Sequence, residues 1–125
     1  MKIVYKKDAL HVDKPEGTMV DYYLRNEYEL HYNKQVPHTT QTWHHHDHIL
    51  ETLFIIDGEL LVQWKKQGVH HEEIVKTGDL IETENTPHTF INQSDSLVRF
   101  IVIKQVLSGT NKKHLLKTDK VLDQE

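Results

Sequence analysis

The most chemically suggestive part of the chain is residues 43–51, which read WHHHDHILE and place four histidines and two carboxylates in nine positions. The sequence has no cysteine, so a metal would have to be held by imidazole and carboxylate groups, which suit divalent first-row ions. In a strand, residues i and i+2 point the same way about 6.5–7 Å apart, which lets two imidazoles bind one ion. The pairs His44/His46 and His46/His48 both have this spacing. The stretch is therefore either a metal site or an exposed histidine-rich loop.

Glu51 favours the first pair. Glu51 is an odd number of residues from each of these histidines, so in a continuous strand its side chain would point to the opposite face. The chain must therefore turn before the carboxylate can face the same side as the imidazoles. Four residues follow His46 and leave room for that turn, whereas only two residues separate His48 from Glu51. We therefore predict His44, His46 and Glu51 as ligands, with His48 as the rival. Glu51 can alternatively act as a general base or accept a hydrogen bond from a ligand.

A fourth ligand should come from another strand. Residues 78–92, GDLIETENTPHTFIN, supply His88, which follows a proline and precedes the apolar residues Phe90 and Ile91. This context predicts that His88 opens a buried strand and that Asn92 has a structural role. His38, Thr40, Gln41 and Thr42 lie on the approach to the ligands and can line a pocket.

The elements that must position these residues are short strands. Alternating aromatic and apolar residues predict strands at 20–24 and 28–32, and apolar runs predict strands at 52–56 and 60–64 joined by a hairpin at Asp57-Gly58. Further strands are predicted at 69–75, from Leu80 onward, and at 97–106, where Val98, Phe100 and Val102 share one face. No helical stripe of 11 or more residues occurs in this body, so the pattern favours a sandwich or barrel. The tail from Ser108, with Gly109 and Asn111, is predicted to be a short helix or a loose arm on the surface.

Length and charge exclude several classes of function. A chain of 125 residues is expected to form one domain, and its formal net charge of -4 argues against a nucleic-acid or anionic-membrane partner. No apolar run approaches the roughly 20 residues of a membrane span, and the N-terminal residues lack the apolar stretch of a secretory signal, so we expect a cytoplasmic protein. Five histidines outside the two stretches are expected at the surface: His11, His31, His70, His71 and His114.

The two stretches together resemble the cupin superfamily, over roughly residues 38–104. The first cupin motif is similar to His44-x-His46, four residues, Glu51, six residues, Gly58. The second is similar to Gly78-Asp79 followed by Pro87-His88-Thr89-Phe90-Ile91-Asn92.

This sequence departs from the family pattern at two glycines. His38 stands where the first motif has glycine, and Asn85 stands where the second has glycine. Asparagine is the non-glycine residue best suited to a left-handed backbone, so the second turn is expected to survive.

The resemblance implies an all-β, single-domain cupin jelly-roll β-barrel with a short C-terminal helix or arm. Residues 1–37 would supply N-terminal strands of the barrel and a dimer contact, residues 38–106 the cupin core barrel, and residues 107–125 the tail. The implied metal ligands are His44, His46, Glu51 and His88, with Glu51 also as the catalytic residue. They would hold one divalent first-row transition metal per chain: iron, manganese, nickel, zinc or copper.

The implied function is that of a metal-dependent enzyme that acts on a small oxygenated metabolite by isomerase, lyase or dioxygenase chemistry. The substrate would be a keto or hydroxy acid, a sugar derivative or a diketone. One alternative is a non-catalytic metal-binding or sensing module. Another is a metal-free barrel like the sugar-nucleotide isomerases, with His44 or His46 as acid and base; this needs grouped basic residues for a diphosphate, and the sequence shows no such group. A homodimer is also expected, because the aromatic strands within residues 20–32 have few partners in so short a barrel.

Overall fold

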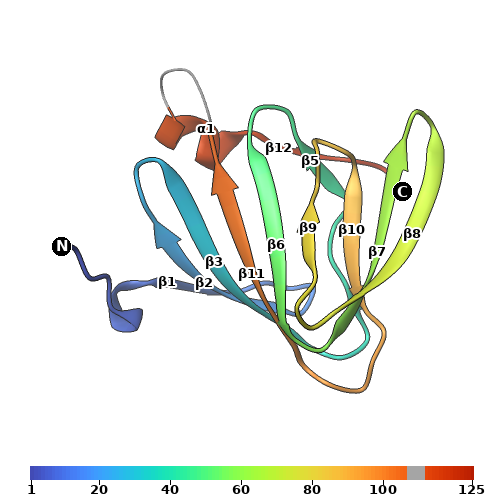
Figure 1. Cartoon of the computed structure of the whole chain (residues 1–125), viewed down its shortest axis with the longest axis horizontal. Coiled ribbons are helices and arrows are strands. Elements are labelled where there is room, and N and C mark those ends of the chain that lie inside the picture. Colours follow the sequence, from blue (N-terminus) through green and yellow to red (C-terminus); the bar gives the residue numbers. More distant parts are fainter. Residues whose placement is uncertain (107–111) are drawn as a thin grey trace.

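The computed structural model describes residues 1–106 and 112–125, and it consists almost entirely of β-strands (Figure 1). The strands are β1 (Leu10–Asp13), β2 (Thr18–Leu24), β3 (Tyr28–Gln35), β4 (Thr39–Thr40), β5 (His44–His46), β6 (Leu50–Asp57), β7 (Glu59–Lys66), β8 (Val69–Lys76), β9 (Leu80–Glu82), β10 (His88–Asn92), β11 (Val98–Gln105) and β12 (Lys120–Leu122). Two short helices are η1 (Lys6–Asp8) and α1 (Lys112–Thr118). The strands form two antiparallel sheets, in the orders β1-β2-β3-β11-β6-β9 and β12-β5-β10-β7-β8, with β4 paired to β10. This is the predicted all-β jelly-roll architecture.

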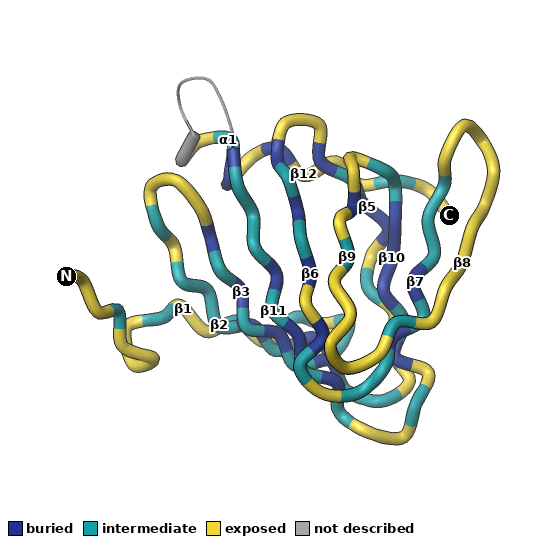
Figure 2. The backbone as a smooth tube through the Cα atoms, in the orientation of Figure 1, coloured by how far each residue is buried: buried dark blue, intermediate teal, exposed yellow. Residues whose placement is uncertain are grey.

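The main hydrophobic core lies between the two sheets. The residues of β11 alternate, so that Val98, Phe100 and Val102 are buried while the residues between them are half-exposed (Figure 2). Opposite them lie Leu60 of β7 and Phe90 of β10. Full burial of each such side chain stabilises the folded state by about 1.5–3 kcal/mol. The prediction that Val98, Phe100 and Val102 share one face is therefore confirmed.

The hairpin predicted at Asp57-Gly58 is wrong, although strands do form on both sides of it. β6 pairs with β11 and β9 in one sheet, whereas β7 pairs with β10 and β8 in the other. The chain therefore changes sheets at Gly58, which has a φ of +108°. A Cβ at this position would lie 3.0 Å from Cγ2 of Val98. Glycine is needed here for a left-handed corner that packs against β11.

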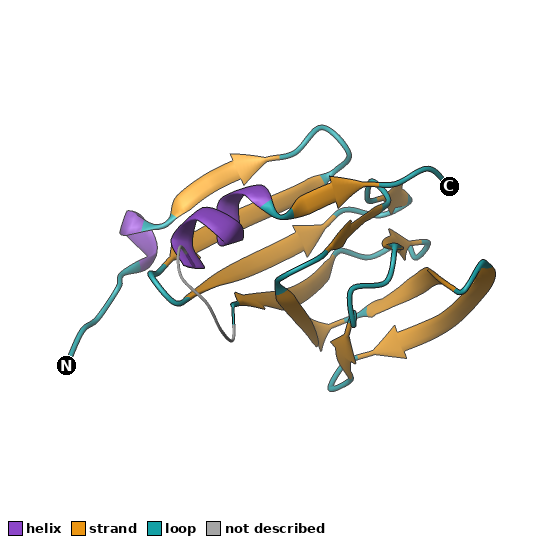
Figure 3. Cartoon of the chain, turned by 90° about the horizontal axis from the view of Figure 1, so that it is seen from above, coloured by secondary structure: helices purple, strands orange, loops and turns teal. Residues whose placement is uncertain are grey.

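The tail is not the predicted surface appendage, although the predicted short helix does form. α1 and β12 lie over the upper ends of the strands (Figure 3), and Leu116 of α1 is buried against Ile49 and Val106. β12 pairs antiparallel with β5, with Lys120 opposite His46. The tail thus supports the strand that carries two of the predicted ligands. Ser108, Gly109 and Asn111, on which part of that prediction rested, lie outside the described residues.

Neither helix in the described part of the chain has the length and apolarity that crossing a bilayer requires. The homodimer and the cytoplasmic location stay predictions, as does the absence of nucleic-acid and membrane partners.

Candidate metal centre

Four buried side chains meet between the sheets, at the end of the barrel near α1 and β12. His44 and His46 come from β5, and His88 is the first residue of the neighbouring β10, directly opposite His44. Glu51 comes from β6 in the other sheet. The predicted alternation holds, because His45 turns away from the cluster and binds Asp123 through Nδ1.

The loop between β5 and β6 is held by a side chain from the second motif-like stretch. Asn85 adopts the left-handed conformation expected of it, with a φ of +60°. Its Nδ2 donates hydrogen bonds to the carbonyl oxygens of His46 and Ile49. Thr83 donates to the carbonyl oxygen of Glu51 through both its backbone N–H and its hydroxyl. The two stretches therefore fix each other's backbone around the cluster.

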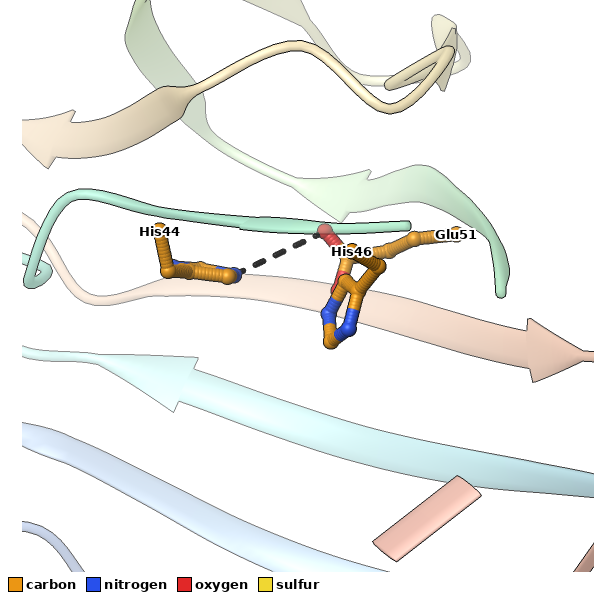
Figure 4. Close-up of side chains that lie close together, drawn as sticks. All are labelled: His44, His46 and Glu51. Atoms are coloured by element: carbon orange, nitrogen blue, oxygen red, sulfur yellow. Dashed lines mark hydrogen bonds and ion pairs between the residues drawn. The ribbon is translucent and has the colours of Figure 1, made fainter. Parts of the chain in front are cut away.

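The carboxylate of Glu51 lies at the centre of the cluster. Its Oε2 is 3.0 Å from Nε2 of His46, and its Oε1 is 2.9 Å from Nε2 of His88 and 3.8 Å from Nε2 of His44. Figure 4 shows His44, His46 and Glu51 directed at one another, and their potential ligand atoms all lie within 4.8 Å. These three residues form a possible metal site.

The hydrogen-bond partners of two of the rings show which nitrogens carry protons. Nδ1 of His44 donates to the carbonyl of Thr42 at 2.9 Å, and Nδ1 of His88 donates to the carbonyl of Thr86 at 2.7 Å. A neutral imidazole has one N–H, so in the neutral form of each ring the lone pair is on Nε2, which faces the carboxylate of Glu51. Lone pairs that face a carboxylate repel it unless a second proton or a cation lies between them.

A second proton on the His44 ring is less favourable than a cation at this position. Burial lowers the pKa of His44, although its contact with Glu51 acts in the opposite direction. Burial alone would raise the pKa of Glu51, but contacts with the imidazoles of His44, His46 and His88 and the charge of Lys104 hold it well below its ordinary value. A carboxylate on which ring nitrogens of three imidazoles converge is a donor set that fits a divalent cation.

The other histidines lie outside this cluster. The exposed ring of His48 binds Asp119 through Nδ1, at 2.8 Å. His70 and His71 are exposed on β8 and pack against Trp43 and Trp64. His11 and His114 are exposed as expected.

His31 is the exception, and the prediction that it lies at the surface is wrong. It is buried on β3, where its Nε2 lies 2.9 Å from Oε1 of Glu29 and its ring contacts Tyr22. The inward face of β3 is polar, with Asn33 and Gln35 also buried, whereas its apolar residues point outward. Hydropathy alone therefore assigns the two faces of this strand the wrong way round.

The burial of His31 predicts how stability depends on pH. Burial lowers its pKa below the ordinary 6.5, although the hydrogen bond to Glu29 raises it. The unfolded chain takes up this proton near pH 6.5 and the folded chain only at lower pH, so the free energy of unfolding should fall as pH drops below 6.5. His31→Gln should reduce that slope, measured by urea unfolding between pH 7 and 5 with a chelator present.

His11 provides the control for that experiment. Hydrogen bonds from its ring to Asp21 and Asp13 raise its pKa, so its contribution is fully present below pH 6.5 and is lost at higher pH. His11→Gln should therefore leave the slope below pH 6.5 unchanged. An equal slope in the wild type and His31→Gln contradicts the assignment.

Two cavities flank the cluster. The inner cavity, about 230 Å³, is lined by polar groups that include Gln41, Thr42, His44, Glu51, Lys104 and Lys120. The apolar cavity, about 520 Å³, is lined by Val62, Trp64, Val75, Ile81, His88 and Phe90. Gln41 and Thr42 thus line a pocket as predicted. His38 and Thr40 do not: both are exposed, and His38 binds Asp95 through its Nε2.

Sequence reasoning did not single out Lys104, Lys120 or Asp119 as residues near the site. Nζ of Lys104 lies 3.9 Å from Oε2 of Glu51, and burial lowers the pKa of this lysine. Asp119 accepts hydrogen bonds from the backbone N–H groups of His48 and Ile49. The alternation of β11 could have indicated Lys104, because this residue lies on the same face of the strand as the buried residues Phe100 and Val102.

Among the solved structures that share the fold of this chain are three with low sequence identity to it. Vicilin from hazelnut (Corylus avellana) has a TM-score of 0.74 and 18% identity, over 89% of this chain and 34% of that one. A deletion variant of oxalate decarboxylase from Bacillus subtilis has a TM-score of 0.71 and 16% identity, over 85% of this chain and 30% of that one. A sugar phosphate isomerase of the cupin superfamily from Silicibacter pomeroyi has a TM-score of 0.64 and 15% identity, over 78% of this chain and 69% of that one.

These likenesses show the fold and leave the activity open, because fold does not determine function. The chain spans about a third of the vicilin and decarboxylase chains. No curated protein matches it. The family model described as "Cupin domain" matches residues 33–104, which is more than half of the chain. This protein belongs to the cupin-domain family.

Proposed function

We propose that this cupin is a metal-dependent enzyme that acts on a small oxygenated metabolite. One divalent first-row transition ion would be held by His44, His46, Glu51 and His88. The observation that carries this proposal is the direction of the lone pairs. Nε2 of His44 and of His88 faces the buried carboxylate of Glu51, while Nδ1 of each ring donates a hydrogen bond to a backbone carbonyl. A histidine cluster that binds no cation would not need this arrangement.

When bound, such an ion supplies Lewis-acid stabilisation of negative charge that develops on a substrate oxygen. The chain's own residues orient the ligands: Thr42 and Thr86 fix the His44 and His88 rings through their carbonyl oxygens. Glu51 is the proposed catalytic residue because it lines the inner cavity and stays charged at neutral pH. Leu53 and Phe90 are apolar residues that border the same cavity.

Proteins with this fold include enzymes named for different reactions. An oxalate decarboxylase and a sugar phosphate isomerase are among them, so lyase and isomerase chemistry are the first to test. Both act on compounds rich in oxygen, which agrees with a site that combines a cation with polar walls.

Activity should be sought with protein loaded separately with iron, manganese, nickel, zinc or copper. Keto acids, hydroxy acids and sugar derivatives would be tested for deuterium uptake from solvent by NMR and for release of carbon dioxide. We expect turnover that requires metal and disappears in His88→Ala. Turnover in metal-free protein would instead favour acid-base chemistry by His44 or His46. Full metal occupancy without turnover of any substrate would favour the binding or sensing module.

A further inference from the structure

We propose that the inner cavity is a subsite for a second anionic group of the substrate. The substrate would then be a small acid with two anionic groups, one at the metal centre and the other, a carboxylate or phosphate, at a cluster of lysines. This inference rests on the proposed function for the first of those two groups. It names a class of substrate that the family match and the structural neighbours do not assign to this chain.

The lysine cluster consists of Lys14, Lys104 and Lys120, which all line the inner cavity. Lys14 follows β1, Lys104 lies on β11 and Lys120 begins β12. Within the described residues, none of these three ammonium groups makes a hydrogen bond. The fold therefore brings together a cluster of three lysines from segments that are far apart in the sequence. Their positions in the sequence did not reveal this cluster.

Lys104 gives the strongest indication of a ligand. Its side chain is only 14% exposed, and the nearest acidic oxygen is Oε2 of Glu51 at 3.9 Å, which is beyond hydrogen-bond distance. A buried ammonium without a hydrogen-bonded acceptor is costly to maintain. An anion in the cavity would supply that acceptor.

The proposed metal makes the need for an anion greater. A divalent ion bound by Glu51 would draw on the same carboxylate that is the ion-pair partner of Lys104. Glu51 and Glu16 are the two carboxylates that line the cavity, against three lysines. With a divalent ion bound, the positive charge of the ion and the three lysines around the cavity exceeds the negative charge of Glu16 and Glu51.

The size of the cavity limits the substrate. At about 230 Å³ it is smaller than the roughly 300–1,000 Å³ of pockets that hold drug-sized ligands. Asn33 and Gln41 add polar groups to its walls. Lysine binds carboxylate and phosphate as a point charge, so both groups fit the same subsite.

The test is isothermal titration calorimetry of zinc-loaded protein with malonate, phosphonoacetate and acetate. The variants are Lys104→Met and Lys120→Met, with Lys76→Met on the exposed β8 as the matched control. Malonate or phosphonoacetate should bind at least about tenfold more tightly than acetate. Lys104→Met should weaken the preferred dianion about tenfold or more and Lys120→Met about threefold or more, with acetate binding unchanged. The stronger of the two dianions identifies the second group as carboxylate or phosphonate.

Metal content and thermal unfolding of each variant would separate the possible failures. Unchanged dianion affinity in both lysine variants, with metal retained, would overturn the subsite. If the wild type holds no metal, the proposed function fails, and the same titration of metal-free protein still tests the lysines. If Lys104→Met does not fold, Lys120→Met alone decides, because its exposed side chain can change without loss of the β12 backbone pairing.

Discussion

His88→Ala should remove stoichiometric metal from this protein, whereas His70→Ala should leave it bound. His88 is buried at the start of β10 and points its Nε2 at Glu51. Loss of a group that only orients a ligand weakens metal binding by roughly 10–100-fold. Removal of His88, one of the four proposed ligands, should weaken it by more than that. His70 is an exposed histidine of β8 and controls for adventitious binding. Elemental analysis of protein purified without a histidine tag measures the outcome, with about one ion per chain expected in the wild type.

Glu51→Gln should lose metal as well, because an amide keeps the shape of the side chain but not its charge. Equal loss of metal in His70→Ala and His88→Ala would contradict the account, as would retention of the full metal content in Glu51→Gln. Either result would mean that the bound metal is held elsewhere on the chain.

Asp119→Ala should be strongly destabilising. This buried carboxylate accepts hydrogen bonds from the N–H groups of His48 and Ile49 and from the ring of His48. Hydrogen bonds to charged groups contribute about 1.5–3 kcal/mol each, and removal of this side chain should lower the free energy of unfolding by about 2–4 kcal/mol. Urea unfolding at neutral pH measures the change.

The same substitution should weaken metal binding, because Asp119 joins the loop after β5 to the tail strand that pairs with β5. Asp95→Ala is the matched control, since Asp95 is an exposed aspartate that also binds a histidine, His38. The role assigned to the tail is contradicted if Asp119→Ala and Asp95→Ala have the same stability and the same metal affinity.

The core of the site was predictable from the sequence because its information is local. The alternation of a strand decides that His44 and His46 share a side, and the length of the loop decides that Glu51 can turn back to them. Pro87 and the apolar residues after His88 indicate a buried strand without any knowledge of its partners. The left-handed turn at Asn85 was expected because this residue stands where the cupin motif has glycine and asparagine tolerates that backbone conformation.

The parts that sequence reasoning missed depend on contacts between distant segments. Asp57-Gly58 correctly indicates a left-handed turn, but nothing local decides whether the next strand returns to the same sheet or crosses to the other. On the polar inward face of β3, Gln35 donates a hydrogen bond to the carbonyl oxygen of Phe90, which lies 55 residues further along the chain. Lys104 and Lys120 become neighbours of Glu51 only once β11, β12 and β6 are assembled.

The tail shows the same limit. Its mixture of charged and apolar residues indicates a short helix, and α1 does form there. That Asp119 binds the loop before Glu51, and that Val121 pairs opposite His45, cannot be inferred from composition because both contacts join segments about seventy residues apart.

The most direct test of the central claim is a crystal structure of the metal-loaded protein, with anomalous diffraction measured at the absorption edge of the metal. We expect one peak between the sheets, within about 2.0–2.2 Å of Nε2 of His44 and His88, a ring nitrogen of His46 and a carboxylate oxygen of Glu51. A peak at the surface histidines His70 and His71, or a His88 ring turned away from the peak, would contradict the account.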